Sequence, residues 1–336
     1  MNLPTHYLGL RVEETEAGKF SRSIKDLPLA ELPSFEDEVT IRVHYAALNY
    51  KDGLSATGNK GVTRNYPHTP GIDASGVVVA SKHPDFQEGM SVICTSYDLG
   101  MNTSGAFAEY IRVPGSWVIP MPQGYDLRES MVQGTAGLTA GLGLYQMERM
   151  GQNPDMGPLL VTGASGGVGS LAVAIFSQAG YDVWAVTGSA DAHDYLRGLG
   201  AKEILARDEV IDTSGRPILK ARWAGALDTV GGDMLASVIK GTKSYGNVAV
   251  CGLVASPKFD ASVFPFILRG VNVLGVESAE HPMAVRKAVW DKLATSWRVP
   301  MVEGMYTETD LDTLSEAYIP AILEGKTKGR VLAKLV

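Results

Sequence analysis

One short stretch near the middle of the chain, residues 159–170 (LLVTGASGGVGS), limits the fold more than any other. The apolar run 159–161 leads into four glycines between Gly163 and Gly169. Beyond them, apolar side chains recur at the spacing of an amphipathic helix: Val168, Leu171, Ala172, Ile175 and Ala179. Strand, glycine turn and helix in this order are typical of a dinucleotide-binding fold, because glycine lets a diphosphate approach backbone N–H groups.

The segments on either side of this stretch predict two different domains. From residue 130 to 296, strand and helix patterns alternate, which predicts a Rossmann-type α/β domain with a doubly wound parallel sheet. Its further strands are expected at 183–187, 203–205, 225–230, 247–251 and 271–276, and its helices at 131–150, 192–199 and 281–296.

The first third of the chain instead shows short runs of period two between turn residues, at 39–45, 76–80, 91–94 and 108–113. This pattern predicts a small, mostly β domain. The apolar strand 329–335 is expected to return to it. The second domain would then comprise residues 1–129 and 297–336, with the α/β domain inserted within it.

Length and charge exclude several classes of protein. A chain of 336 residues suits two domains, and its net charge of −7 argues against a nucleic-acid-binding surface. No apolar run reaches the roughly 20 residues that span a bilayer, and the N-terminus shows no secretory signal. We therefore expect a cytoplasmic protein with neither a membrane nor a nucleic-acid partner. The two cysteines, Cys94 and Cys251, lie in strand patterns and are interpreted as buried thiols.

Six motifs in fixed order resemble those of the medium-chain dehydrogenases/reductases. They are 46–53 (AALNYKDG), 70–76 (PGIDASG), 134–140 (GTAGLTA), 161–169 (VTGASGGVG), 228–232 (DTVGG) and 264–270 (FPFILRG). Within that superfamily the chain resembles the zinc-free, quinone-oxidoreductase-like branch, and most of all its NADPH-dependent acrylyl-CoA reductase subgroup. The resemblance implies a GroES-like catalytic domain beside the Rossmann-type domain.

The same resemblance predicts that no metal is bound. Where zinc alcohol dehydrogenases carry a cysteine ligand, this chain has Asn49, and where they have Gly-His-Glu it has 71–73 (GID). A third ligand position falls near Thr135. Zinc needs three protein ligands with N, S or O donor atoms, and Ile72 offers none.

The cofactor is predicted to be NADP(H). The turn residues Ser165, Gly166, Gly167 and Val168 would hold the diphosphate. The next strand ends in Thr187, Gly188 and Ser189, where an NAD-selective site usually carries an acidic residue. Arg207 resembles the subgroup's phosphate-facing arginine, although it could instead be a solvated loop residue, with Asp191 as the acidic group. The resemblance adds five cofactor contacts: Tyr50, Thr139, Leu253, Ile267 and Ser278.

The candidate catalytic residues lie in the run 49–52 (NYKD) and at Asp73. A hydride acceptor such as an α,β-unsaturated thioester needs a group that stabilises the enolate and a proton source. Tyr50 could donate the proton, Asn49 could orient substrate or cofactor, Lys51 could raise the positive potential, and Asp73 could orient Lys51 or Tyr50. In the alternative interpretation, Tyr50 only stacks beside the nicotinamide and Lys51 forms an exposed pair with Asp52.

These observations predict an NADPH-dependent reductase of an activated C=C bond, with acrylyl-CoA reduced to propionyl-CoA. The alternatives are a quinone or enone reductase and a non-catalytic NADPH-binding protein. Cations for a CoA substrate, if they are not simply solvated, would come from Lys60, Arg64, Lys326, Lys328 and Arg330. A homodimer is also expected, because the apolar strand 271–276 is predicted at a sheet edge.

Overall fold

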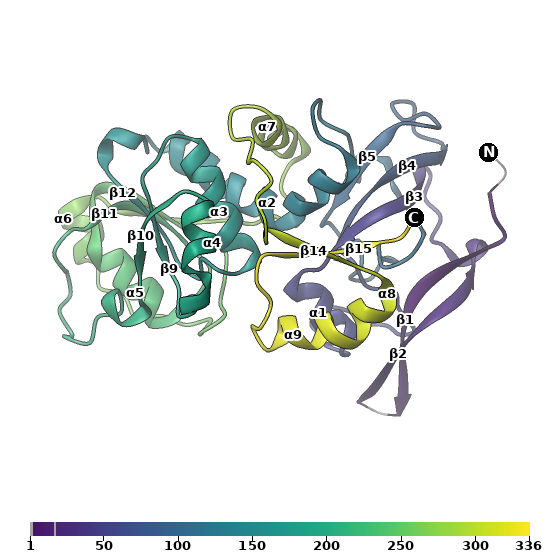
Figure 1. Cartoon of the computed structure of the whole chain (residues 1–336), viewed down its shortest axis with the longest axis horizontal. Helices are drawn as coiled ribbons and strands as arrows, with labels where there is room; N and C mark the ends of the chain where they lie inside the picture. The colour runs from purple at the N-terminus through teal and green to yellow at the C-terminus, as the bar shows by residue number, and fades with distance from the viewer. Residues whose placement is uncertain (1–2, 17) are drawn as a thin grey trace. The chain divides into compact units, whose positions relative to one another are not determined.

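The computed structural model describes residues 3–16 and 18–336, which form two compact units (Figure 1). Unit 1 comprises Met1–Thr135, Ala279–Lys287 and Met305–Val336, and unit 2 comprises Ala136–Ser278 and Ala288–Gly304. The sequence placed the domain limits at 129/130 and 296/297, near two of these divisions. It did not anticipate that the segment 279–287 belongs to unit 1.

Unit 2 is built on a six-stranded sheet in which all neighbouring strands are parallel. The strand order is β10-β9-β8-β11-β12-β13, which is 3-2-1-4-5-6 in chain order and defines a Rossmann-type sheet. This confirms the predicted fold class. The strands are β8 (Leu159–Val161), β9 (Val183–Val186), β10 (Ala201–Leu205), β11 (Trp223–Asp228), β12 (Thr242–Val250) and β13 (Asn272–Gly275).

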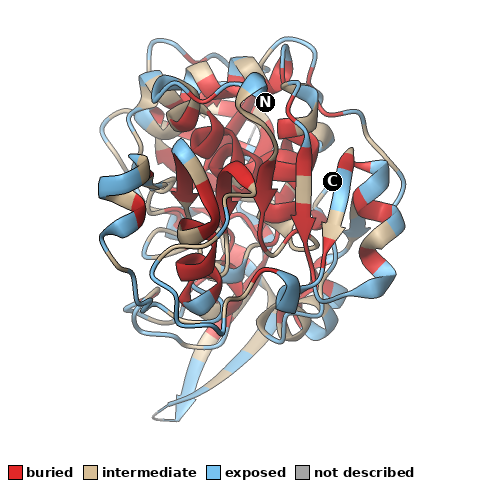
Figure 2. Ribbon diagram, turned by 90° about the vertical axis from the view of Figure 1, so that its left-hand side faces the viewer, coloured by how far each residue is buried: buried red, intermediate tan, exposed pale blue. Residues whose placement is uncertain are grey.

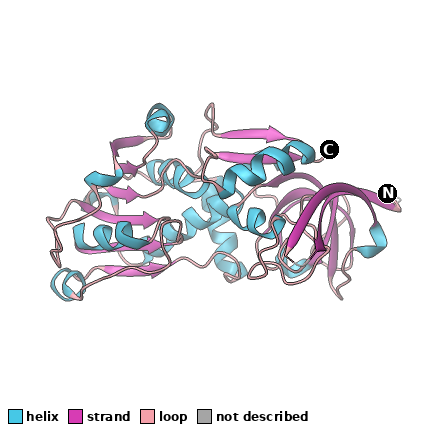
Figure 3. Ribbon diagram, turned by 90° about the horizontal axis from the view of Figure 1, so that it is seen from below, coloured by secondary structure: helices cyan, strands magenta, loops and turns pink. Residues whose placement is uncertain are grey.

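Helices accompany these strands (Figure 3). They are α3 (Gly167–Gln178), α4 (His193–Gly198), α5 (Gly232–Gly241) and α6 (Phe264–Arg269), with short 3-10 turns at Pro154–Met156, Ala190–Ala192 and Arg207–Glu209. Because helices cover the sheet, its central strands are mostly apolar, and every residue of β8 and β11 is buried. Figure 2 shows these strands in the red of buried residues.

Unit 1 contains a seven-stranded, mostly antiparallel sheet and a separate hairpin. The sheet order is β14-β15-β3-β4-β5-β7, and β6 also pairs with β3. The final strand β15 runs antiparallel to β3, with Leu332 opposite Ala47, so the predicted return of the chain's end to the first domain is confirmed. The strands are β3 (Glu38–Ala47), β4 (Asp73–Ser81), β5 (Ser91–Thr95), β6 (Tyr110–Pro114), β7 (Val118–Pro120), β14 (Tyr306–Thr309) and β15 (Arg330–Lys334), and the hairpin is β1 (His6–Glu16) with β2 (Lys19–Pro28).

Several elements of unit 1 were not predicted, and α1 (Tyr50–Ala56) is the most important of them. Helix α1 has only seven residues, too few for an apolar period to be recognised. It packs against α9 (Ile319–Leu323), and a Cβ on Gly53 would lie 3.0 Å from Leu323 Cδ2 (Figure 1). The hairpin, α8 (Leu311–Thr313) and the π-helical turn Leu314–Tyr318 were also missed.

Helix α2 (Leu127–Arg149) was predicted, but its bend at Gly134 was not. Gly134 has φ 49° and ψ −152°, which only glycine adopts readily. A Cβ there would lie 2.5 Å from Asp73 Oδ2 and 3.1 Å from Arg330 Nη2. The bend therefore lets the backbone of α2 approach two buried charged groups. The remaining long helix is α7 (Met283–Ala294). None of the helices described in residues 3–16 and 18–336 combines the length and apolar character needed to cross a membrane.

Candidate functional site

The glycine turn of unit 2 follows the carboxyl end of β8. Gly163 has a positive φ of 59°, and a Cβ on Gly169 would collide with the carbonyl oxygen of Gly163. The turn is joined to the neighbouring strand β9, because Ala164 N donates to Val186 O at 3.0 Å. Gly166 is the N-cap of α3, so the first N–H groups of that twelve-residue helix lack intrahelical partners. These groups can bind a diphosphate, as the sequence predicted for Ser165–Val168.

A buried polar network fixes this end of the sheet. Thr162 Oγ1 donates to Asp228 Oδ1 at 2.7 Å, and Asp228 Oδ2 accepts the Gly231 N–H at 2.7 Å. Thr229 Oγ1 donates to Thr162 O at 2.9 Å, and burial raises the pKa of the Asp228 carboxyl. The network joins the ends of β8 and β11, where the strand order reverses and such sheets bind their ligands. Sequence reasoning missed it, although polar residues ending two apolar strands were a visible signal.

The residues predicted to face a 2′-phosphate lie together. Thr187 Oγ1 donates to Ser165 Oγ at 3.2 Å and accepts the Ser189 N–H at 3.1 Å. A Cβ on Gly188 would lie 2.9 Å from Arg207 Cζ, so the missing side chain makes room for the guanidinium. Arg207 is exposed, and no carboxylate pairs with it within the described parts of the chain. The group forms a small cationic, hydroxyl-lined surface that fits a phosphate.

The other predicted cofactor contacts are less tightly gathered. Thr139 Oγ1 donates to Ser278 Oγ at 2.8 Å, so these two residues meet. Leu253 and Ile267 are 62% and 69% exposed. Tyr50 belongs to unit 1.

A second polar cluster lies in unit 1 around Asp73, the first residue of β4, which is fully buried. Asp73 Oδ2 accepts hydrogen bonds from Asn49 Nδ2 at 2.9 Å and from Thr135 N at 2.8 Å. Asp73 Oδ1 accepts one from Thr135 Oγ1 at 2.5 Å. Arg330 Nη2 lies 3.6 Å from Asp73 Oδ2, and Ser96 Oγ is 2.7 Å from Thr135 Oγ1.

Helix α1 begins at this cluster. Asn49 is its N-cap, and the Asn49 N–H donates to Asp52 Oδ2 at 2.7 Å, while Asp52 Oδ1 accepts the Ile72 N–H at 2.8 Å. Burial, and after it the negative charge of Asp73, raise the pKa of the Asp52 carboxyl from 3.8 to about 7. Burial also raises the pKa of Asp73, although the Arg330 guanidinium opposes that rise.

These contacts revise three sequence-based expectations. Asp73 does not orient Lys51 or Tyr50 directly, because its carboxylate binds Asn49, Thr135 and Arg330. The alternative of an exposed pair between Lys51 and Asp52 is wrong, because Asp52 is fully buried and accepts backbone N–H groups. The amide of Asn49 binds within the protein at both ends, so it is not free to orient a ligand.

Tyr50 and Lys51 remain as the accessible members of the predicted catalytic set. Tyr50 is 52% exposed, and Lys51 is half-buried. Neither has a hydrogen-bond or ionic partner within residues 3–16 and 18–336. Both lie in the first turn of α1, directly after its half-buried N-cap, Asn49. The phenol and the ammonium can therefore interact with a bound molecule.

At least three of the five cations considered for a CoA substrate, Lys60, Lys326 and Arg330, interact with groups of the protein. Lys60 Nζ lies 2.8 Å from Glu14 Oε2 and 4.7 Å from the centre of the Tyr66 ring. Lys326 pairs with Glu324 at 2.6 Å, and Arg330 is only 3% exposed.

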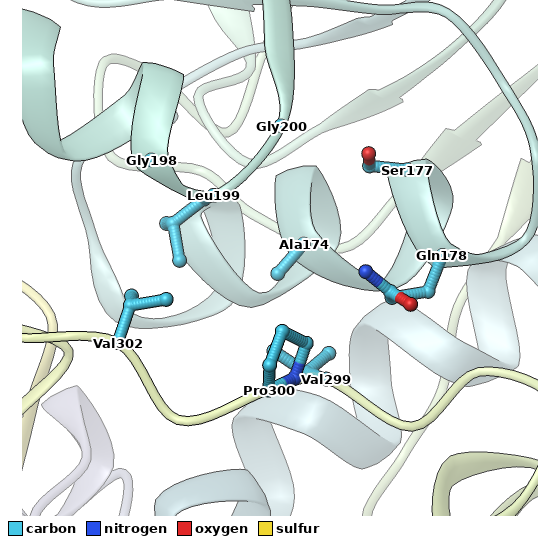
Figure 4. Close-up of a pocket in the computed structure, with 9 residues that line it drawn as sticks. All are labelled: Ala174, Ser177, Gln178, Gly198, Leu199, Gly200, Val299, Pro300 and Val302. Atoms are coloured by element: carbon cyan, nitrogen blue, oxygen red, sulfur yellow. The ribbon is translucent and has the colours of Figure 1, made fainter.

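Two cavities, one in each unit, lie away from the predicted site. One, of about 80 Å³, lies at the carboxyl-terminal end of α3 between Ser177, Leu199 and Pro300 (Figure 4). It cannot hold a diphosphate bound at Gly166, because a twelve-residue helix places its ends roughly 18 Å apart. A groove of about 340 Å³ in unit 1 runs beside Arg11, Glu31 and His68.

Unit 2 has a Rossmann-type sheet with this glycine turn, and unit 1 has an accessible tyrosine and lysine in the first turn of α1. This combination is typical of a dinucleotide-dependent oxidoreductase. Family models agree with that class. The model described as alcohol dehydrogenase GroES-like domain matches residues 36–123, and the one described as zinc-binding dehydrogenase matches residues 167–295.

Three relatives are similar over almost their whole length. The Bacillus subtilis protein named "Putative quinone oxidoreductase YhfP" is 43% identical over 96% of this chain and 97% of its own. The crystal structure of Bacillus subtilis yhfP with NAD bound has a TM-score of 0.95 and 42% identity, and it covers 99% of this chain and 100% of that one. Acrylyl-CoA reductase AcuI of Ruegeria pomeroyi is 42% identical over 95% of this chain and 96% of its own. The yhdH oxidoreductase of Salmonella enterica, crystallised with NADP, has a TM-score of 0.92 and 40% identity, covering 98% of this chain and 100% of that one. The chain belongs to the quinone-oxidoreductase-like medium-chain dehydrogenases/reductases.

The description of the second family model implies zinc, and the residues here do not fit it. Ile72 is 3% exposed and has no donor atom, while Asn49 and Thr135 are both bound to Asp73. In residues 3–16 and 18–336 there is no group of three His, Cys, Asp or Glu side chains that could hold a metal ion. Zinc sites use at least three such N, S or O ligands.

Proposed function

We propose that this protein is an NADPH-dependent reductase of an activated C=C bond and that acrylyl-CoA is its substrate. One observation carries the proposal. The side chains of Asn49, Asp73 and Arg330 bind one another, whereas the Tyr50 phenol stays accessible in the first turn of α1. A phenol suits a hydride acceptor that needs a hydrogen bond or a proton and no metal. AcuI, 42% identical, supports the choice of substrate.

The cofactor side of the proposal rests on Arg207. Its guanidinium beside Gly188 favours a 2′-phosphate, while the N–H groups of Gly166–Val168 would hold the diphosphate. NADP in the yhdH structure agrees with this preference, whereas the yhfP structure contains NAD. Bound NADPH supplies the hydride.

The residues of unit 1 would act on the substrate. Hydride added to the β-carbon of the thioester turns the C=C–C=O system into an enolate, and a proton added to the α-carbon completes the saturated product. The Tyr50 O–H would donate a hydrogen bond to the enolate oxygen or supply that proton, which solvent then replaces. The Lys51 ammonium would raise the positive potential beside the developing negative charge.

The test is to follow NADPH consumption with acrylyl-CoA, a benzoquinone and a 2-alkenal under the same conditions. We expect the highest kcat/KM with acrylyl-CoA. A benzoquinone preferred by about a hundredfold, equivalent to about 2.7 kcal/mol, would overturn the substrate assignment.

The second candidate is a quinone reductase. It is favoured by the ion pairs of Lys60 and Lys326, which leave fewer cations for the phosphates of CoA, and by the similarity to YhfP. Such an enzyme would turn over the quinone and show no gain from the CoA group. A third candidate, a non-catalytic protein, would bind NADPH and oxidise it with none of the three acceptors.

We also propose a homodimer formed at β13. This strand is the edge of the six-stranded sheet, with Val273 39% exposed. Exposed apolar side chains cluster in the same part of the sequence: Tyr245, Leu253, Val254, Phe259, Val263, Phe264, Ile267 and Leu268. An apolar sheet edge of this kind pairs readily with a second copy. Light scattering at micromolar concentration should give the mass of a dimer, and Val273→Lys should give a monomer. Dimeric mass in that variant would place the interface elsewhere.

A cytoplasmic location stays a prediction, which cell fractionation tests.

A further inference from the structure

Arg330 is a buried cation whose hydrogen bonds and ion pair connect four separate segments of unit 1. Arg330 is the first residue of β15 and is 3% exposed. Its Nε donates to Val132 O in α2 at 3.2 Å, and its Nη1 donates to Leu48 O at 3.3 Å and to Asn49 Oδ1 at 3.3 Å. Its Nη2 lies 3.6 Å from Asp73 Oδ2 in β4. The guanidinium therefore holds residues 48 and 49, which lead into α1, against the sheet.

The pair of Arg330 and Asp73 also fixes the orientation of the Asn49 amide. Asp73 accepts a hydrogen bond from the NH₂ group of Asn49, and Arg330 donates one to its oxygen. A flipped amide would put its oxygen against a carboxylate and its NH₂ group against a guanidinium. Because Tyr50 follows Asn49 directly, the position of the phenol depends on this arrangement.

The other end of α1 is held independently of Arg330. Arg22 Nη1 donates to Ala56 O at 3.4 Å, and Tyr66 Oη donates to Ser55 O at 2.7 Å. Loss of the Arg330 side chain should therefore loosen the first turn of α1, which carries Tyr50 and Lys51, and leave its last turn in place.

We propose that Arg330 is a positioning residue for the reaction: through the amide of Asn49 it holds Tyr50 at the place where the substrate reacts. The inference rests on the proposed role of Tyr50. Beyond that role, Arg330 would control turnover although it is buried in the final strand and touches neither substrate nor cofactor.

The central experiment compares Arg330→Ala with Lys334→Ala, which removes an exposed cation from the same strand. We expect Arg330→Ala to lower kcat by about 10–100-fold, because a displacement of about 1 Å at a reacting group can have this effect. The KM for NADPH should stay close to that of the unaltered protein, since the proposed cofactor-binding residues Gly166–Val168 and Arg207 belong to unit 2. Guanidinium, added below the concentration that unfolds the protein, should restore part of the kcat in Arg330→Ala and have no such effect in Lys334→Ala.

Two further variants keep the inference testable if Arg330→Ala folds poorly. Asn49→Ser retains the ion pair of Arg330 and Asp73 and should still lower kcat to a similar degree. Tyr50→Phe combined with Arg330→Lys should lose much less activity than the product of the two single losses, because both substitutions act on one group. The positioning role would be overturned if the losses in the double variant were fully multiplicative, or if kcat in Arg330→Lys were unchanged. It would also be overturned if the KM for NADPH in Arg330→Ala rose by the same factor by which kcat fell.

Hydrogen exchange separates this inference from the proposed substrate. The amides of Asp52 and Gly53, which bind Asn49 O, should exchange faster in Arg330→Ala than in Lys334→Ala, whichever hydride acceptor the protein uses. Exchange of α1 that is equal in the two variants would overturn the inference even if acrylyl-CoA is the substrate. Faster exchange of these amides would support it even if the substrate proves to be a quinone.

Discussion

A methyl group added at Gly134 gives the sharpest test of the buried cluster in unit 1. In Gly134→Ala the new Cβ would lie 2.5 Å from Asp73 Oδ2 and 3.1 Å from Arg330 Nη2. The backbone of α2, the carboxylate and the guanidinium are all buried there, so none of them can move away without breaking a hydrogen bond. The substitution should therefore separate Asp73 from its partners.

Two contributions to the loss of stability can be estimated. The backbone conformation of Gly134, with φ 49° and ψ −152°, costs an alanine about 1–3 kcal/mol. Breaking a buried ion pair by displacing one partner costs about 3–5 kcal/mol more. The matched control is Gly89→Ala in the same unit. Gly89 also has a positive φ, of 89°, but its Cβ would meet nothing within 4 Å, so this variant should show backbone strain alone.

The assay is urea unfolding of both variants, followed by hydrogen exchange of peptides from unit 1. We expect the free energy of unfolding of Gly134→Ala to fall below that of Gly89→Ala by about 3 kcal/mol or more. If the two variants lose the same free energy to within about 0.5 kcal/mol, the pair of Asp73 and Arg330 does not hold this region together and the reasoning fails.

Three further predictions concern single side chains. Tyr50→Phe should lower kcat by about a hundredfold with little change in thermal stability, because the phenol is exposed, and an unaltered kcat would remove its proposed proton role. Arg207→Ser should raise the KM for NADPH about tenfold and leave that for NADH unchanged, whereas equal changes in the two would contradict a 2′-phosphate contact. The pKa of Asp52, about 7, lies above its unfolded value of 3.8, so the stability gained from its proton is full below about pH 4 and is lost as pH rises through 7. Asp52→Asn should lack this decline in unfolding free energy, and a decline of the same size in the variant would show that another group causes it.

The Rossmann-type unit could be predicted from the sequence because its pattern is local. A strand, a glycine turn and a helix follow one another within residues 159–178, and the central strands β8 and β11 are mostly apolar because both faces of the sheet are covered. The grouping of Thr187, Gly188 and Ser189 could be predicted for the same reason, since these residues are adjacent in the chain. The approach of Arg207 to Gly188 was suggested by resemblance.

The polar cluster of unit 1 could be predicted only in part. Asn49, Asp73 and Thr135 were identified by the resemblance, but their mutual hydrogen bonds depend on segments far apart in the sequence. Arg330 was considered as a surface cation for a substrate, because nothing near it in the sequence shows that β15 carries it into the interior. The seven-residue helix α1 and the bend at Gly134 arise from tertiary packing and leave no periodic signal.

The position of Arg330 in the chain has a consequence for folding during synthesis. The hydrogen bond from Arg330 to Leu48 O joins residues 282 positions apart, and β15 pairs directly with β3. Unit 2 takes most of its residues from the continuous segment Ala136–Ser278, so its sheet can form while the ribosome is still adding residues. Until β15 emerges, residues 45–47 of β3 lack their partner on one side, and Asp73 and Asn49 lack the cation that binds them. A nascent chain should therefore acquire its nucleotide-binding fold well before the turn that carries Tyr50 is fixed.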